Sequence, residues 1–182
     1  MIRFLKVLGV VLLILILIPL IAGLFLPKEY SLTRSAEINL PKDTVFDYVV
    51  LLRNQEQYGV WNKIDPGMNQ AYRGTDGTVG FVSAWDSDHK EAGKGEQEIV
   101  AIIPGERVDH EIRFQKPFRT VAQAWITTEE ANQGKTLVTW GMSGKMNYPI
   151  NAMGLFMNME KAIGKDYDQG LSELKRILEE SK

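Results

Sequence analysis

The pattern of apolar and polar positions divides the chain into one continuous apolar run and a longer part in which the two kinds alternate. From Val7 to Leu26 no residue is charged, and only Pro19 disfavours a helix. A helix of about 20 residues spans about 30 Å, the thickness of the hydrocarbon core of a bilayer. A proline is tolerated there because a kinked membrane helix recovers its backbone hydrogen bonds locally. The run therefore predicts a transmembrane helix.

Alternation with a period of two follows from Tyr30 to Leu40, which is typical of a half-buried strand. A helix is expected to begin at Pro41, and a second short helical stretch carries Tyr58 and Trp61. Six further segments are rich in strand-forming residues and are separated only by turns, which leaves no room for crossover helices. They are Gln70–Gly74, Val79–Asp86, Gly93–Ile103, Arg107–Gln115, Thr120–Glu129 and Lys135–Lys145. We therefore expect an antiparallel meander.

The chain closes with a long amphipathic helix, expected from about Pro149 to Glu180. Its inner stripe consists of Met159, Ile163, Tyr167, Gly170, Leu174 and Ile177. The order of elements is thus a strand, two short helices, six strands and a long helix. This order predicts an α+β fold in which an antiparallel sheet is covered on one face by the terminal helix.

The apolar run has two interpretations. A cleaved signal peptide usually has an apolar stretch of about 7–15 residues and a small-x-small cleavage site, whereas this run is longer and ends in the bulky Leu24, Phe25 and Leu26. We therefore prefer an uncleaved anchor over residues 1–28, followed by one domain over residues 29–182. Because Arg3 and Lys6 precede the run, the positive-inside rule places the N-terminus in the cytoplasm and the domain outside it.

Composition narrows the partners of this exported domain. All 23 acidic residues but only 19 of the 21 basic ones follow Leu26, so the domain has a net charge of −4. This balance argues against a nucleic-acid surface, which needs a basic stripe. The chain has no cysteine, which excludes a disulfide framework and a thiolate metal site. We expect a monomer in a bacterial inner membrane, with its domain facing the periplasm or the cell exterior.

The parity of the strands predicts what faces the interior. In Gly93–Ile103 the charged residues share one parity, so Gly93, Gly95 and Ala101 share the inner one with Gln97 and Ile99. Since close packing would otherwise fill the space beside small residues, we interpret them as leaving a void. An apolar cavity with a few polar groups suits a small-molecule ligand. The alternative is a solid core in which every polar group has an internal partner.

Candidate ligand-binding residues come from these inner positions and from the apolar stretch that precedes the predicted last helix. This stretch is apolar nearly all the way round, and it could lie over a pocket mouth, touch lipid or simply fill the core. The candidates are Phe81, Ser83, Trp85, Gln97, Ile99, His110, Ile112, Phe114, Trp140, Met153, Phe156 and Met157.

Several short motifs recur in one known group of proteins. They include Ser35–Pro41 leading to Val45–Val49, Trp61 followed by Asp65-Pro66, Pro104–Val108, Val138-Thr139-Trp140 and Gly164-Lys165-Asp166. With these motifs the chain resembles the SRPBCC superfamily over about residues 29–180. This group contains START domains, birch-pollen-allergen-like proteins, and polyketide cyclases/dehydrases and lipid-transport proteins. Gln55–Tyr58 departs from the pattern, since related sequences often carry a tryptophan there.

The resemblance implies a helix-grip fold, in which a seven-strand antiparallel sheet curls around the C-terminal helix and encloses a hydrophobic cavity. It does not imply one activity. We expect a binding module for a hydrophobic small molecule or lipid that needs no cofactor and no metal. One alternative is a cyclase/dehydrase-like enzyme that uses the inward His110 as general acid or base. Another is a protein-interaction module that uses the outer face of the sheet.

Overall fold

A computed structural model describes residues 2–89, 91–155 and 158–180. The helices are α1 (Ile2–Gly23), α2 (Lys42–Val49), α3 (Gln55–Tyr58), α4 (Val60–Ile64) and α5 (Met159–Glu180), with 3-10 turns η1 (Leu52–Asn54), η2 (Asn132–Gly134) and η3 (Ile150–Leu155). The strands are β1 (Glu29–Ile38), β2 (Asn69–Arg73), β3 (Val82–Asp86), β4 (Lys94–Ile103), β5 (Arg107–Lys116), β6 (Thr120–Ala131) and β7 (Lys135–Lys145). The predicted order of the strands and the terminal helix is confirmed, and the second helical stretch, expected around Tyr58 and Trp61, is divided into α3 and α4.

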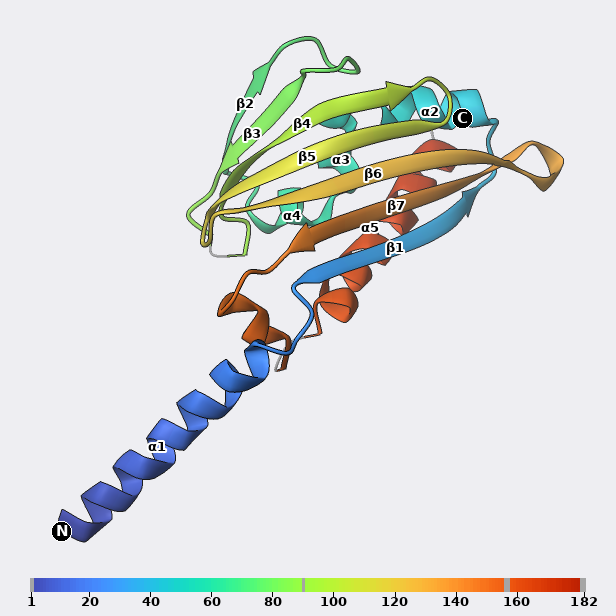
Figure 1. Ribbon diagram of the computed structural model, residues 1–182. Coiled ribbons are helices and arrows are strands. Elements are labelled where there is room, and N and C mark those ends of the chain that lie inside the picture. The colour runs from blue at the N-terminus through green and yellow to red at the C-terminus, as the bar shows by residue number, and fades with distance from the viewer. Residues whose placement is uncertain (1, 90, 156–157, 181–182) are drawn as a thin grey trace.

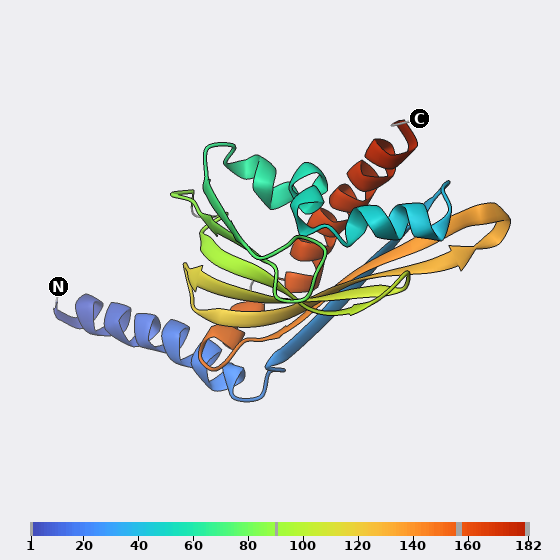
Figure 2. The same ribbon diagram turned by 90° about the horizontal axis from the view of Figure 1, so that it is seen from above.

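The seven strands form one antiparallel sheet in the order β1-β7-β6-β5-β4-β3-β2. Strands β2 to β7 pair in chain order, which is the predicted meander. Strand β1 pairs with β7 at one edge of the sheet, where Leu32 lies opposite Met142. The sheet curls over α5, while α2, α3 and α4 lie on the same concave side (Figures 1 and 2). This is the α+β helix-grip arrangement that the family resemblance implies.

Helix α5 is held against the sheet by large side chains of its inner stripe. Tyr167, Leu171 and Leu174 are buried, and the Tyr167 ring stacks on Trp140 of β7 with a centroid distance of 4.2 Å. Gly170 permits this close approach, because a Cβ at that position would lie 2.8 Å from the Trp140 ring and 3.3 Å from the carbonyl oxygen of Tyr58. The crossing of α5 over β7 therefore needs a residue without a side chain.

The predicted start of the last helix at Pro149 is wrong, because α5 begins ten residues later. Residues from Ile150 form the 3-10 turn η3, in which the Ala152 amide donates to the Pro149 carbonyl. Asn158 then marks the new start, since its side-chain oxygen accepts the Lys161 amide proton at 2.9 Å. An asparagine in this role stabilises a helix N-terminus by satisfying an otherwise unpaired backbone donor. The apolar stretch thus forms a separate turn between β7 and α5.

The inner row predicted for β4 holds only as far as Ile99. The pairing with β5 shifts between Ile99 and Ala101, so that one extra residue, Val100, is left in the ladder. A bulge of this kind reverses the faces on which the following side chains lie. Ala101 and Ile103 are consequently exposed, and Ile102 packs against the core instead. The expectation that Ala101 faces the interior is wrong for this reason.

Replacing Leu174 with alanine tests how α5 is held. Leu174 is fully buried, so Leu174→Ala should lower the free energy of unfolding by about 2–5 kcal/mol through lost burial and a residual cavity. Ser172 lies on the exposed face of the same helix, and Ser172→Ala should change it by less than about 0.5 kcal/mol. Urea unfolding in mild detergent measures both. Equal effects would contradict the packing described.

Candidate functional site

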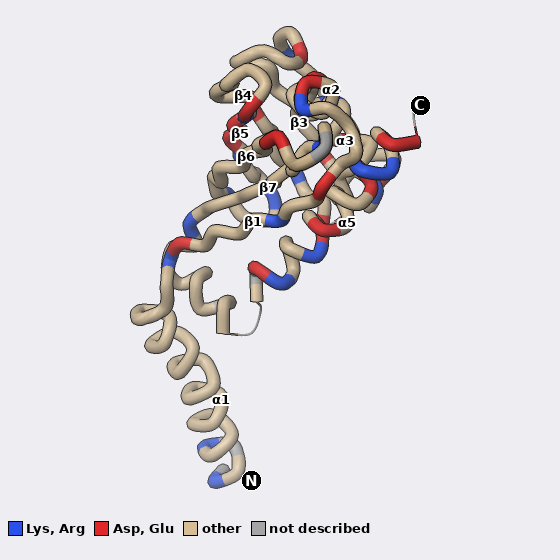
Figure 3. Tube along the Cα trace, turned by 90° about the vertical axis from the view of Figure 1, so that its right-hand side faces the viewer, with Lys and Arg blue, Asp and Glu red and all other residues tan. Residues whose placement is uncertain are grey.

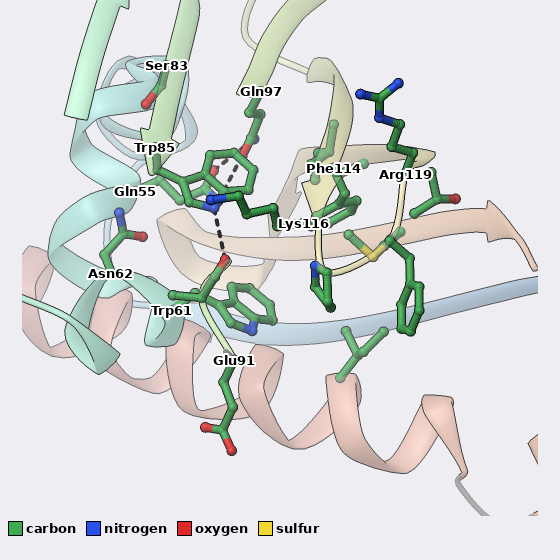
Figure 4. Close-up of a pocket in the computed structure, with 18 of the residues that line it drawn as sticks. Gln55, Trp61, Asn62, Ser83, Trp85, Glu91, Gln97, Phe114, Lys116 and Arg119 are labelled. Atoms are coloured by element: carbon green, nitrogen blue, oxygen red, sulfur yellow. Dashed lines mark hydrogen bonds between the residues drawn. The ribbon is translucent and has the colours of Figure 1, made fainter. Parts of the chain in front are cut away.

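A pocket of about 470 Å³ lies between the concave face of the sheet and helices α3, α4 and α5 (Figure 4). Its inner end is formed by residues that are buried in the core, namely Leu52, Gln97, Ile112, Ala124, Trp140, Met142 and Tyr167. Its outer end is formed by residues that are exposed, namely Glu91, Lys116, Pro117, Phe118, Arg119, Thr120, Lys145 and Asn147. The pocket therefore runs from the core to the surface, and these exposed residues form its mouth.

Two groups of aromatic rings face each other across the pocket. On the helical side, the Trp61 ring of α4 meets the Tyr167 ring of α5 edge-on at 5.8 Å. On the sheet side, Trp85 of β3 and Phe114 of β5 meet edge-on at 6.0 Å, and the Trp85 indole N–H donates to the Ala92 carbonyl at 2.9 Å. These rings present apolar surface on both walls, which is the environment that an apolar ligand requires.

Few polar groups lie at the inner end. Gln55 of α3 and Gln97 of β4 exchange side-chain amide hydrogen bonds of 3.4 and 3.2 Å, so each satisfies the other. Ser83 and Asn62 also line the pocket, and their side chains have no hydrogen-bond partner among the described residues. A ligand with one polar group can therefore be oriented at Ser83 or Asn62 without breaking an existing bond.

The structure brings half of the twelve candidate residues together at this pocket. Ser83, Trp85, Gln97, Ile112, Phe114 and Trp140 line it. Phe81, Ile99 and His110 are buried in the core outside its lining. Phe156 and Met157 lie outside the described residues, as does the side chain of Met153. A role of the six lining residues in ligand binding stays a prediction.

Some of the other lining residues, such as Tyr30, Ala124 and Met142, lie on strands. Several more come from helices and connections, which strand parity does not reach. They include Gln55, Trp61, Asn62, Phe118, Met146 and Ile150. The short segment around Trp61 gave a partial signal, because a tryptophan in a helix of only five residues needs an apolar surface to cover it. Phe118 gave no signal of this kind, since a single phenylalanine in a turn does not show which surface it contacts.

The pocket does not arise from glycines, so the interpretation of Gly93 and Gly95 as the source of a void is wrong. A Cβ on Gly95 would lie 2.6 Å from the Trp85 ring and 2.8 Å from the Arg113 carbonyl oxygen. A Cβ on Gly93 would meet the backbone of Lys116. Both glycines are covered by neighbouring groups, and the free space lies between the aromatic walls.

His110 is too deep to act on a ligand in this pocket. It lies on β5 opposite Ile99 and Ala124 and is 1% exposed, and neither ring nitrogen has a hydrogen-bond partner among the described residues. Burial lowers the pKa of its imidazole to about 4, and the nearby Asp109 opposes this shift. A general base needs contact with the group that it deprotonates. The geometry therefore gives no support to catalysis by His110.

The fold and its pocket define a helix-grip protein, and comparison with known sequences gives its family. A family profile described as polyketide cyclase / dehydrase and lipid transport matches residues 29–179. The chain belongs to this family and thereby to the SRPBCC superfamily. Among curated proteins no relative matches.

Solved structures show the same fold at low sequence identity. Ara h 8.0201 is 12% identical, with a TM-score of 0.55, and the match covers 82% of this chain and 97% of that one. A protein of Mesorhizobium loti is 15% identical, with a TM-score of 0.60 and coverage of 84% and 99%. A hypothetical protein of Helicobacter pylori is 9% identical, with a TM-score of 0.61 and coverage of 81% and 87%. At such identities the likeness concerns the fold alone.

The buried histidine makes stability depend on pH. Because the folded state depresses the pKa of His110 from 6.5 to about 4, the unfolded state binds the proton more readily. The stability from the neutral imidazole is complete above about pH 6.5 and falls by about 3 kcal/mol as the pH drops to about 4. His110→Leu should lose less stability over this range in urea unfolding, and His89→Leu, in an exposed loop, should behave as wild type. Parallel curves for wild type and His110→Leu would contradict the assignment.

Proposed function

We propose that the chain is a membrane-anchored binding module for a hydrophobic small molecule or lipid, held in the pocket between the sheet and α5. The observation that carries the proposal is the pocket itself, which has about 470 Å³ of space between aromatic walls and an open path to the surface. Pockets of about 300–1,000 Å³ with mostly apolar linings bind drug-sized ligands. The family includes lipid transport in its description, which supports the same class of ligand.

The pKa shifts of two tyrosines, Tyr167 in the pocket lining and Tyr72 beside it, favour binding over acid-base catalysis. Glu56 accepts a hydrogen bond from the Tyr72 hydroxyl, and burial, followed by this bond, raises the pKa of Tyr72 to about 12. Burial also raises the pKa of Tyr167, and Glu91 is exposed at the mouth. Both shifts move the tyrosine hydroxyls further from neutral pH, where a general acid or base must exchange protons.

Helix α1 supports the anchor. In the part of the chain that the structure describes, only α1 contains a segment long and apolar enough to cross a membrane, Lys6–Gly23, and almost all of it is exposed. The charges of α1 gather near its N-terminus (Figure 3), which by the positive-inside rule orients that end toward the cytoplasm. We propose residues 1–28 as the anchor and residues 29–182 as a monomeric domain on the outer side of a bacterial inner membrane.

A contact between α1 and the domain favours retention of the helix over cleavage as a leader. The side-chain amide of Asn151 in η3 is buried and donates to the carbonyl oxygens of Gly23, at 2.6 Å, and Leu26, at 3.4 Å. Ala152 packs beside Gly23, where an added Cβ would lie 3.0 Å from the Ala152 Cβ. Cleavage near Leu26 would remove these hydrogen bonds and the packing of α1 on η3.

Two alanines on β6 provide the test of binding. Ala122 and Ala124 are both buried on the inner face, but only Ala124 borders the pocket. Ala124→Leu should place its side chain in ligand space and lower the affinity for an apolar fluorescent dye at least tenfold, with little loss of stability. Ala122→Leu should instead overpack the core, lower the free energy of unfolding by about 1–3 kcal/mol and leave dye affinity within about twofold.

Dye titration and urea unfolding of the chain in mild detergent separate the two effects. If the wild type binds no apolar ligand, or if Ala124→Leu binds as tightly as wild type, the pocket is not the binding site.

A fractionation experiment tests the anchor. Because Asn151 ties η3 to the end of α1, the chain should remain in membranes after a carbonate wash, and its intact mass should include residues 1–26. A reporter fused after Lys182 should be active only on the exported side. Recovery of a soluble chain that lacks residues 1–26 would show that the helix is a cleaved leader.

A further inference from the structure

One end of the domain carries exposed apolar side chains around the pocket mouth. The β5–β6 connection, the end of β7 and η3 all lie toward the end of the molecule from which α1 departs, in both Figure 1 and Figure 2. The exposed apolar residues of this end are Phe118 (54%), Val121 (49%), Tyr148 (44%) and Leu155 (46%). Leu24 and Phe25, directly after α1, are more exposed still.

The opposite end carries exposed apolar residues too, but they do not border the pocket between the sheet and α5. Val79 lies in the β2–β3 connection and Ile103 at the end of β4, and neither lines the pocket. Phe118, in contrast, lines the pocket while it remains half exposed. The exposed apolar residues therefore border the pocket only at the end where α1 departs, through Phe118.

Hydrogen bonds fix the pocket mouth relative to the end of α1. Asn151 of η3 binds the carbonyl oxygens of Gly23 and Leu26, and Ile150 of the same turn lines the pocket. The Met146 amide donates to the Lys28 carbonyl at 2.7 Å, and the Met146 side chain belongs to the pocket lining. The linker between α1 and β1 is thus bound to η3 near the end of α1 and to Met146 just before β1 begins.

Charge at the mouth matches an interface between water and lipid. Lys116 and Arg119 flank Phe118 and are exposed; Arg119 has no ion-pair partner among the described residues, and Lys116 has only Asp86 at 3.8 Å. Lys145 is paired with Glu29, and Glu91 is the other acidic group of the mouth. An apolar tip between two long basic side chains enters an interface readily, because the apolar group leaves water while the cations meet phosphates.

We propose that the pocket mouth opens directly onto the bilayer that α1 spans. Residues 117–121 enter the interfacial layer, with Phe118 toward the acyl chains and with Lys116 and Arg119 at the anionic lipid head groups. A membrane lipid then passes from the leaflet into the pocket without crossing bulk water. The inference rests on the proposed function, since it names the source of the ligand and the path that it takes.

Because the chain has no cysteine, single cysteines can report depth in the membrane. Val121 and Val79 form a matched pair of exposed valines outside the pocket lining, at the anchor end and at the far end. Val121→Cys and Val79→Cys, each labelled with an environment-sensitive dye, are reconstituted as full chains in phosphatidylglycerol–phosphatidylcholine vesicles that contain spin-labelled lipid. The dye at position 121 should be quenched at least threefold more than the dye at position 79.

A transfer experiment gives the second arm. Val121→Asp should slow the transfer of a pyrene-labelled phospholipid from the vesicle into the pocket about tenfold, and Val79→Asp should not. Affinity for the same lipid delivered from detergent micelles should stay within twofold in both variants, because neither valine lines the pocket.

If lipid delivered from micelles still binds, equal quenching at positions 121 and 79 overturns the proposal that the mouth faces the bilayer. Equal transfer rates for Val121→Asp and Val79→Asp overturn it as well. Loss of all lipid binding in the wild type instead removes the proposed function on which the inference rests.

Discussion

The structure depends on the stacking of Tyr167 on Trp140, where α5 crosses β7 with Gly170 as the point of closest approach. This contact holds the helix near the β1–β7 side of the sheet, and Arg34 of β1 adds a hydrogen bond to Asp168. Helix α2 covers one end of the concave face with the buried Val45, Phe46 and Val49. The part toward the pocket is left to the short helices α3 and α4, whose side chains do not fill it. The pocket is the space that remains between these helices, α5 and the inner face of the sheet from β3 to β7. The position of α5 on the sheet thus determines where the pocket lies.

Most of the fold could be read from periodicity, because side chains on a pleated strand alternate whatever their neighbours are. The inner rows of β5 and β7 are buried as the alternation predicts, from Val108 to Ile112 and from Val138 to Met142. The alternation failed at Val100, since a bulge is a property of the pairing between two strands and not of one strand's residues. At Gly95 the alternation held and the glycine is buried, but the void inferred beside it is absent, because the Trp85 ring covers it. A glycine has the same pattern in both cases.

The candidate site was predictable only on its sheet side for the same reason. Trp85 and Phe114 share a face that alternation identifies, whereas Trp61 and Asn62 reach the pocket through the tertiary placement of a five-residue helix. One local signal was available and unused. Asn158 stands directly before Met159, and an asparagine at that place is a common helix start. This helix start separates α5 from η3, the turn that holds Asn151.

The bound linker limits how far cargo can be carried. Residues 24–28 would reach only about 18 Å when fully extended. The hydrogen bonds of Asn151 to Gly23 and Leu26 keep this linker shorter than its full reach. With α1 in one bilayer, as we propose, the domain searches for ligand in two dimensions and cannot ferry it across an aqueous gap to a second membrane. Any onward movement of the ligand needs an acceptor that comes to the same membrane face. Under this proposal the domain stays at one membrane face, and the fraction of pockets that hold a ligand depends on the lipid composition of the adjacent leaflet.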